Sequence, residues 1–160
     1  MGKKKVLVSA CLLGRNCKYD GGNNYSEALV RYLKEKAVEV MEVCPEVEGG
    51  LPVPRVPVEL VDGVAINRAG ENVDACFRAG VKAVLDRIRE EEITAAILQP
   101  RSPSCGVEQV YDGSFTGRLV PGEGMFARAL RQAGIPVFDA AAFCGKGRED
   151  YVRHFEELIR

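Results

Sequence analysis

Three cysteines stand out because each one follows an apolar, strand-like run. Cys11, Cys44 and Cys105 begin or end the segments SACLLG, CPEVEGGLPVPR and SPSCG, which are rich in Pro, Gly or Ser. If the preceding runs are neighbouring parallel strands, three thiols that are distant in sequence meet at one edge of a sheet. Converging thiolates bind soft metals or iron–sulfur clusters. The sequence therefore predicts a metal or cluster site at Cys11, Cys44 and Cys105.

An alternation of short strands and helices must position these thiols. Short β-rich runs predict strands at residues 5–9, 37–43, 94–98 and 135–138. Apolar residues at helical spacing predict helices at residues 26–36, 73–89, 124–133 and 151–159, with Ser26 as an N-cap of the first. Gly80 is the unfavourable residue within the second of these helices.

This alternation predicts an α/β fold. We expect a three-layer, Rossmann-like or flavodoxin-like fold with a short, mainly parallel sheet of about four strands and helices on both faces. A common order places the first strand between the second and third, and neighbouring strands lie about 4.8 Å apart. Under that order the three cysteines fall close together.

Two connecting segments are unusually long. Residues 44–72 contain Pro45, Pro52, Pro54 and Pro57, which exclude a central strand, and we expect an irregular segment there. Residues 106–124 are rich in glycine and predict a small hairpin or a long loop.

Composition narrows the class of protein. A length of 160 residues predicts one domain spanning residues 1–160. The net charge of −1 and the absence of Trp argue against a nucleic-acid partner. No run approaches the ~20 apolar residues of a membrane span. The short apolar run at residues 6–13 is interpreted as a strand rather than a signal peptide, so we expect a cytoplasmic protein with reduced cysteines.

The residues alone leave several chemistries open for the three thiols. Zinc usually takes four ligands, often with C-x2-C spacing, which is missing here, and the single histidine, His154, lies far along the chain in the last predicted helix. A cubane cluster held by three cysteines would keep one iron open as a Lewis acid. A nucleophilic Cys11 is a third option, although a C-x5-R anion loop would need Arg where Cys17 stands.

The other cysteines have simpler interpretations. Cys76 is expected to be a small core residue of the second helix, and Cys144 to be a structural residue of a Gly-flanked turn. For Cys17 we favour structural packing, with a spare thiol near the site as the alternative.

Four motifs in order give the chain a family resemblance. SACLLGRNCKYDGGNN, CPEVEGGLPVPRVPVEL, ILQPRSPSCG and YDGSFTGRLVPGEG resemble the thiouracil desulfidase family over residues 4–140 or so. The resemblance implies a [4Fe-4S] cluster that is held by three cysteines and whose fourth iron binds the sulfur of a thiolated uracil. The expected products are uracil and sulfide.

The resemblance also implies roles for individual residues. Cys11, Cys44 and Cys105 would ligate the cluster, Glu46 would act as acid or base, and Ser102 would contact the substrate.

Other residues are candidates on their position in the sequence. Ser104 is the competing serine of the same motif. Arg55 is expected to meet a pyrimidine oxygen, with a surface salt bridge as its alternative, and Asp112 is a loop residue near the proposed site.

The leading hypothesis is therefore an iron–sulfur-dependent desulfidase that hydrolyses the C=S bond of a small thiolated pyrimidine, with no nucleic-acid or membrane partner. A C=S sulfur is soft and suits cluster iron. The alternatives are a non-enzymatic metal- or redox-sensing module and a cysteine-nucleophile hydrolase without iron.

Overall fold

A parallel sheet forms the centre of the protein in a computed structural model that describes residues 3–160. Within those residues the central sheet has four strands, in the order β2-β1-β5-β8. They are β1 (Lys5–Ser9), β2 (Glu39–Val43), β5 (Ile93–Leu98) and β8 (Val137–Asp139). Every neighbouring pair is parallel, so the predicted α/β fold and the central place of the first strand are confirmed.

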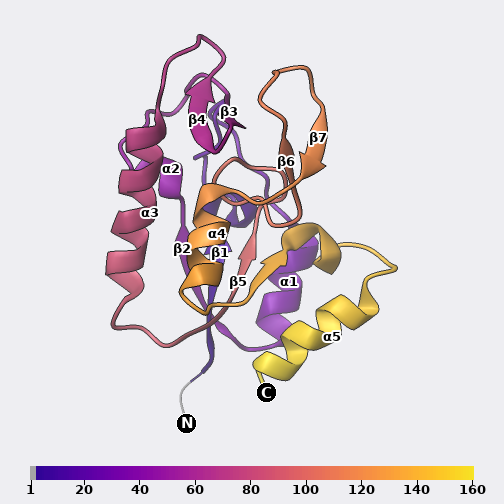
Figure 1. Ribbon diagram of the computed structural model, residues 1–160. Helices are drawn as coiled ribbons and strands as arrows, with labels where there is room; N and C mark the ends of the chain where they lie inside the picture. Colours follow the sequence, from indigo (N-terminus) through magenta and orange to yellow (C-terminus); the bar gives the residue numbers. More distant parts are fainter. Residues whose placement is uncertain (1–2) are drawn as a thin grey trace.

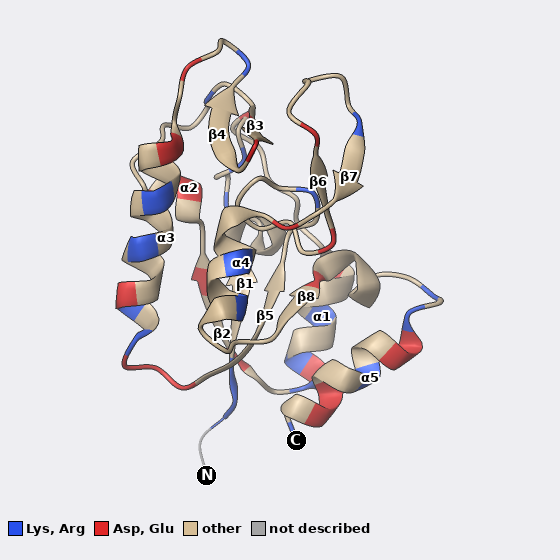
Figure 2. Ribbon diagram, in the orientation of Figure 1, with Lys and Arg blue, Asp and Glu red and all other residues tan. Residues whose placement is uncertain are grey.

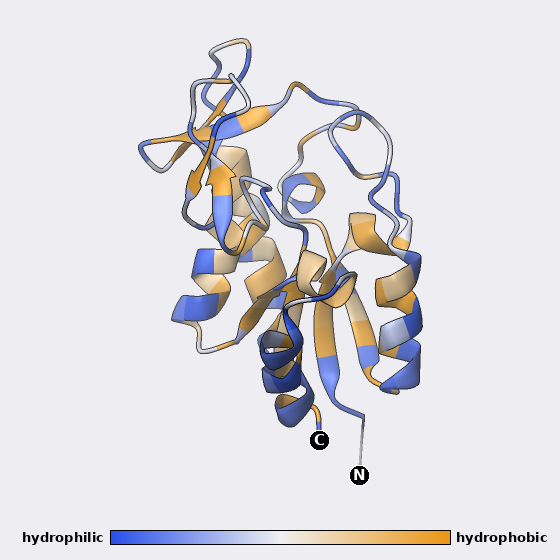
Figure 3. Ribbon diagram, turned by 90° about the vertical axis from the view of Figure 1, so that its right-hand side faces the viewer, coloured by the Kyte–Doolittle hydropathy of each residue, from blue (hydrophilic) through white to orange (hydrophobic). Residues whose placement is uncertain are grey.

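Helices cover both faces of this sheet (Figure 1). One face carries α3 (Asp74–Ile88) and α4 (Met125–Gln132), and the other carries α1 (Glu27–Glu35) and α5 (Glu149–Leu158). Side chains alternate along a strand, so Leu7 packs in the first layer while Val6 and Val8 pack in the second. Apolar residues fill the strands in Figure 3, and charged residues mark the outer helix surfaces in Figure 2.

The sequence-based helices agree with the structure to within two residues at each end. Ser26 caps α1 as predicted, because its Oγ accepts a hydrogen bond from the Leu29 backbone N–H at 3.2 Å. Two 3₁₀ turns, η1 (Ala10–Leu13) and η2 (Ala140–Phe143), follow β1 and β8 directly. None of the helices within residues 3–160 has the length and apolar character needed to cross a membrane.

The prediction that residues 44–72 are irregular is wrong. This segment forms the short helix α2 (Pro45–Glu48) and an antiparallel hairpin of β3 (Val58–Val61) and β4 (Val64–Asn67). Pro45 occupies the first turn of α2, where proline is tolerated, and the remaining prolines precede β3. Asp62 and Gly63 make the hairpin turn with φ of 50° and 79°, the left-handed conformation that such turns require.

The glycine-rich segment forms the predicted small hairpin. It consists of β6 (Gln109–Tyr111) and β7 (Leu119–Pro121), paired antiparallel. Both hairpins rise beyond the carboxyl edge of the central sheet (Figure 1), on the side opposite the two chain ends. They therefore add walls to the sheet edge where the cysteine-bearing loops begin.

Candidate functional site

The carboxyl ends of three neighbouring strands bring the three cysteines to one cavity. Ser9 pairs with Val43 and Val8 pairs with Ile97, so β1, β2 and β5 end at about the same level. Cys11, Cys44 and Cys105 all line a cavity of about 470 Å³, within the range of about 300–1,000 Å³ typical of small-molecule sites.

The same cavity collects every residue that the sequence analysis assigned to ligation, catalysis or substrate binding. These residues are Cys11, Cys44, Glu46, Arg55, Ser102, Ser104 and Cys105. Asp112, Cys76 and Cys144 are not among the described residues that line it. The Asp112 carboxylate instead accepts hydrogen bonds from Ser114 within its own turn.

Local structure fixes the three cysteines in different ways. Cys11 lies in η1, where the chain turns directly out of β1. Cys44 is the N-cap residue of α2, and its N–H donates to Glu48 Oε2 at 3.1 Å. Arg87 of α3 holds that same carboxylate at 3.0 Å. The CPE segment is thus tied to the long helix α3.

The SPSCG loop is fixed by the start of α4. The Ser104 carbonyl accepts the N–H groups of Phe126 at 2.8 Å and Ala127 at 3.1 Å. Gly124 packs so closely that a Cβ there would lie 2.5 Å from the Ser104 carbonyl. A glycine at this position lets the loop dock on the helix and sets the position of Cys105.

Cys17 joins the site, contrary to the favoured interpretation of simple packing. Its side chain lines the cavity and hydrogen-bonds with the thiols of Cys11 and Cys44. The hydrogen bond from Cys17, and a weaker one from Asn24 Nδ2 at 3.5 Å, lower the pKa of Cys11 to about 7. The same Cys17 thiol lowers the pKa of Cys44, and its own pKa is raised in return. The C-x5-C spacing was the signal for this residue.

Cys105 has a different environment from the other two thiols. Burial raises the pKa of Cys105 to about 12, because an apolar surrounding disfavours the thiolate. A bound cationic metal centre reverses this preference, since a coordinating thiol loses its proton.

The donor set fits a soft inorganic group. Three thiols from separate loops face one cavity, and soft thiolates select metals such as iron in sulfide clusters. Within residues 3–160, no three Cys, His, Asp or Glu side chains are arranged as a site for a single metal ion.

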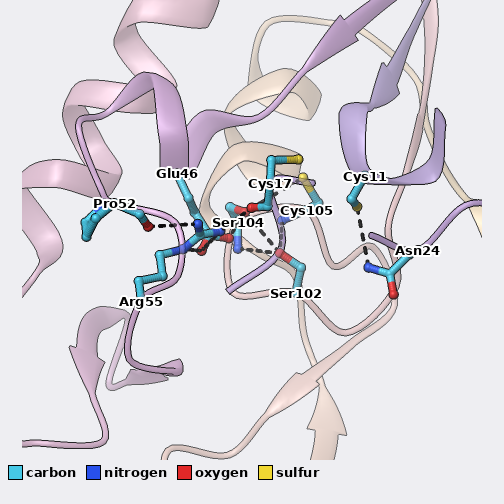
Figure 4. Close-up of polar contacts among 9 residues, drawn as sticks. All are labelled: Cys11, Cys17, Asn24, Glu46, Pro52, Arg55, Ser102, Ser104 and Cys105. Carbon is cyan, nitrogen blue, oxygen red and sulfur yellow. Dashed lines mark hydrogen bonds and ion pairs between the residues drawn. The ribbon is translucent and has the colours of Figure 1, made fainter. Parts of the chain in front are cut away.

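Two serines and a carboxylate form a chain of hydrogen bonds beside the thiols (Figure 4). Ser104 Oγ donates to Glu46 Oε2 at 2.7 Å and lies 3.0 Å from Ser102 Oγ. Ser102 Oγ already accepts the N–H groups of Ser104 and Cys105, at 3.1 and 3.0 Å. Each hydroxyl carries one hydrogen, so the Ser102 hydroxyl donates to Ser104 and Ser104 donates to Glu46.

Arg55 is committed to protein groups in this structure. Its Nε donates to Glu46 Oε1 at 3.2 Å, Nη1 to the Pro52 carbonyl at 3.3 Å and Nη2 to the Cys17 carbonyl at 2.9 Å. The side chain is only 6% exposed, so the pair with Glu46 is buried and the alternative of a surface salt bridge is wrong. The contact with a pyrimidine oxygen stays a prediction.

Several cavity residues were not named by the sequence analysis. Besides Cys17 they include Lys18, Tyr19, Asn24, Glu59, Arg68, Arg101, Tyr111 and Phe115. Tyr111 and Phe115 lie within the motif YDGSFTG, which was the available signal for this wall of the cavity.

Comparisons with known proteins agree with this geometry. Residues 6–141 match the family described as 2-thiouracil desulfurase. The uncharacterized protein YbbK of Bacillus subtilis (strain 168) is 34% identical over 142 residues, which cover 82% of this chain and 93% of YbbK. A solved structure of a [4Fe-4S]-dependent thiouracil desulfidase, TudS, superposes with a TM-score of 0.84 at 34% identity, covering 98% of this chain and 100% of TudS.

Proposed function

The chain belongs to the 2-thiouracil desulfurase family, and from this premise we propose that it is an iron–sulfur-dependent desulfidase that hydrolyses the C=S bond of a small thiolated pyrimidine. The observation that carries the proposal is the meeting of three thiols, a carboxylate and two serines in one cavity of small-molecule size. These groups come from loops after three different strands, so their convergence is a property of the fold.

The thiolates of Cys11, Cys44 and Cys105 would hold a [4Fe-4S] cluster, the cofactor named for the similar TudS structure. When bound, such a cluster supplies a Lewis-acidic iron without a protein ligand, which suits the soft sulfur of a thiocarbonyl group.

Glu46 would act as the general base. A water adds to the carbon that carries sulfur, Glu46 accepts a proton from that water, and the sulfur leaves as sulfide. This exchange replaces C=S by C=O and gives uracil from thiouracil. A positioned carboxylate contributes about 10²–10⁴ to such a rate.

The neighbouring residues would keep Glu46 in place. Arg55 holds Oε1 and Ser104 holds Oε2, so both carboxylate oxygens are oriented before substrate binds. Ser102, the outer member of the serine pair, would contact the substrate, with Ser104 behind it. Preorganised donors of this kind need no rearrangement during the reaction.

The proposal is tested on protein purified without oxygen. Iron and acid-labile sulfide are measured per chain, and 2-thiouracil and 4-thiouracil are then supplied while uracil and sulfide are quantified. We expect iron and sulfide in the protein and equal amounts of uracil and sulfide as products. Cluster-loaded protein that releases no sulfide would favour a sensing module, whereas sulfide release without iron would favour a cysteine nucleophile.

A further inference from the structure

Phe115 adopts a backbone conformation that a bulky residue rarely takes. Its φ is 58°, in the left-handed region that favours glycine. Such a conformation persists only where the surrounding structure imposes it, and these residues cluster at functional sites. Phe115 lies in the turn between β6 and β7 and lines the cavity that holds the thiols.

A buried carboxylate from the other hairpin imposes this conformation. Glu59 of β3 is 8% exposed, and its Oε1 accepts the N–H groups of Gly113 at 2.9 Å and Phe115 at 3.1 Å. Gly113 also packs against β3, where a Cβ would lie 2.8 Å from the Leu60 carbonyl oxygen. Glu59 therefore latches the β6–β7 turn onto the β3–β4 hairpin.

The aromatic ring of Phe115 is held from outside as well. The Arg68 guanidinium lies over the ring, 5.9 Å from its centroid, within the range of a cation–π contact. Arg68 is itself exposed and follows β4 directly. The latch and this cation together orient an apolar, flat surface in the wall of an otherwise polar cavity.

We propose that Phe115 is the stacking platform for the substrate ring and that Glu59 and Arg68 are its positioning residues. This inference rests on the proposed function and adds a requirement on the substrate, which must be a flat unsaturated heterocycle. A planar ring presents a face to the π system of Phe115, and a puckered ring does not. The polar groups of the cavity bind the edge of the ring in either case.

The first test is kinetic. The Phe115→Leu variant keeps an apolar side chain and removes the aromatic face, so we expect KM for thiouracil to rise by about 2- to 12-fold with kcat unchanged. Thermal unfolding of the variant confirms that it is folded. A folded variant with the wild-type KM overturns the inference.

The second test measures binding without turnover. The chain has no Trp, so Phe115→Trp introduces a single fluorescent reporter into the loaded protein. Uracil should quench its emission saturably, and 5,6-dihydrouracil, which has the same polar groups on a puckered ring, should quench it at least several-fold less. Tyr25→Trp is the matched control, because Tyr25 is 54% exposed and is not among the described cavity residues.

The outcomes separate this inference from the proposed function. Equal quenching by the two ligands, or equal quenching of the two Trp variants, overturns the stacking role. If the wild-type protein releases no sulfide but uracil selectively quenches Phe115→Trp, the proposed reaction fails and the stacking platform stands. If sulfide is released and the Phe115→Leu variant keeps its KM, the reaction stands and the platform fails.

Discussion

Gly80 and Pro45 approach so closely that a Cβ on Gly80 would lie 1.8 Å from the Pro45 carbonyl oxygen. Gly49 completes the contact from the other side, because a Cβ there would lie 2.0 Å from the carbonyl oxygen of Cys76. The two glycines let α2 lie directly on α3. Since α2 begins immediately after Cys44 and contains Glu46, this contact sets the position of two proposed site residues.

Replacing Gly80 by Ala should destabilise the protein. In an exposed helix this change is stabilising by about 1 kcal/mol, but overpacking a tight contact costs about 1–3 kcal/mol or more. We expect a lower free energy of unfolding in urea and less bound iron, because α2 must shift. Gly145→Ala is the control, since nothing lies within 4 Å of a Cβ there. A Gly80→Ala protein as stable as wild type would contradict the role of this contact.

Replacing Cys11, Cys44 or Cys105 by Ser should each remove most of the bound iron and its visible absorption. Oxygen in place of sulfur is a poor ligand for cluster iron. The matched controls are Cys76→Ser and Cys144→Ser, which alter residues outside the described cavity lining. Iron retained in all three site variants would rule out the proposed ligand set.

Cys17→Ser addresses the fourth thiol of the cavity. If three cysteines hold the cluster, this variant should keep its iron and its absorption, because serine still donates a hydrogen bond toward Cys11 and Cys44. Iron analysis on anaerobically prepared protein gives the answer. Loss of iron to the level of the Cys11 variant would make Cys17 a ligand.

Glu46→Gln should lower kcat by about 10²–10⁴ while leaving the iron content unchanged. The amide keeps the size and an acceptor oxygen for Ser104 but cannot take a proton from water. Glu42→Gln is the control, because Glu42 pairs only with exposed Arg15 among the described ion pairs. A Glu46→Gln enzyme with wild-type kcat would remove Glu46 from the mechanism.

Arg55→Met should destabilise the protein strongly. The side chains of Arg55 and Glu46 are 6% and 13% exposed, and breaking a buried pair by removing one partner costs about 3–5 kcal/mol. Urea unfolding measures the loss, and kcat should fall because Glu46 loses its orientation. Arg55→Lys keeps the charge and should recover part of both. Unchanged stability in Arg55→Met would show that other groups hold Glu46.

Local patterns in the sequence were sufficient for the central layers. The apolar stripe of residues 73–89 predicts α3 (Asp74–Ile88) closely, since burial of one helix face leaves a periodic trace in the sequence. The same holds for the strands, and the rule for strand order then placed the cysteine-bearing loops at one sheet edge. The β3–β4 hairpin was missed because its prolines dominated the local signal, although Asp62 and Gly63 form a recognisable hairpin turn.

The sequence by itself thus determined the fold class, the family resemblance and the gathering of Cys11, Cys44 and Cys105, all of which follow from periodicity, motif order and parallel topology. Only the tertiary structure decided what the cavity residues contact. The pairing of Arg55 with Glu46 and the latch from Glu59 to Phe115 join separate loops and hairpins. Such contacts depend on how distant elements pack in three dimensions, and packing between elements leaves no periodic trace along the chain.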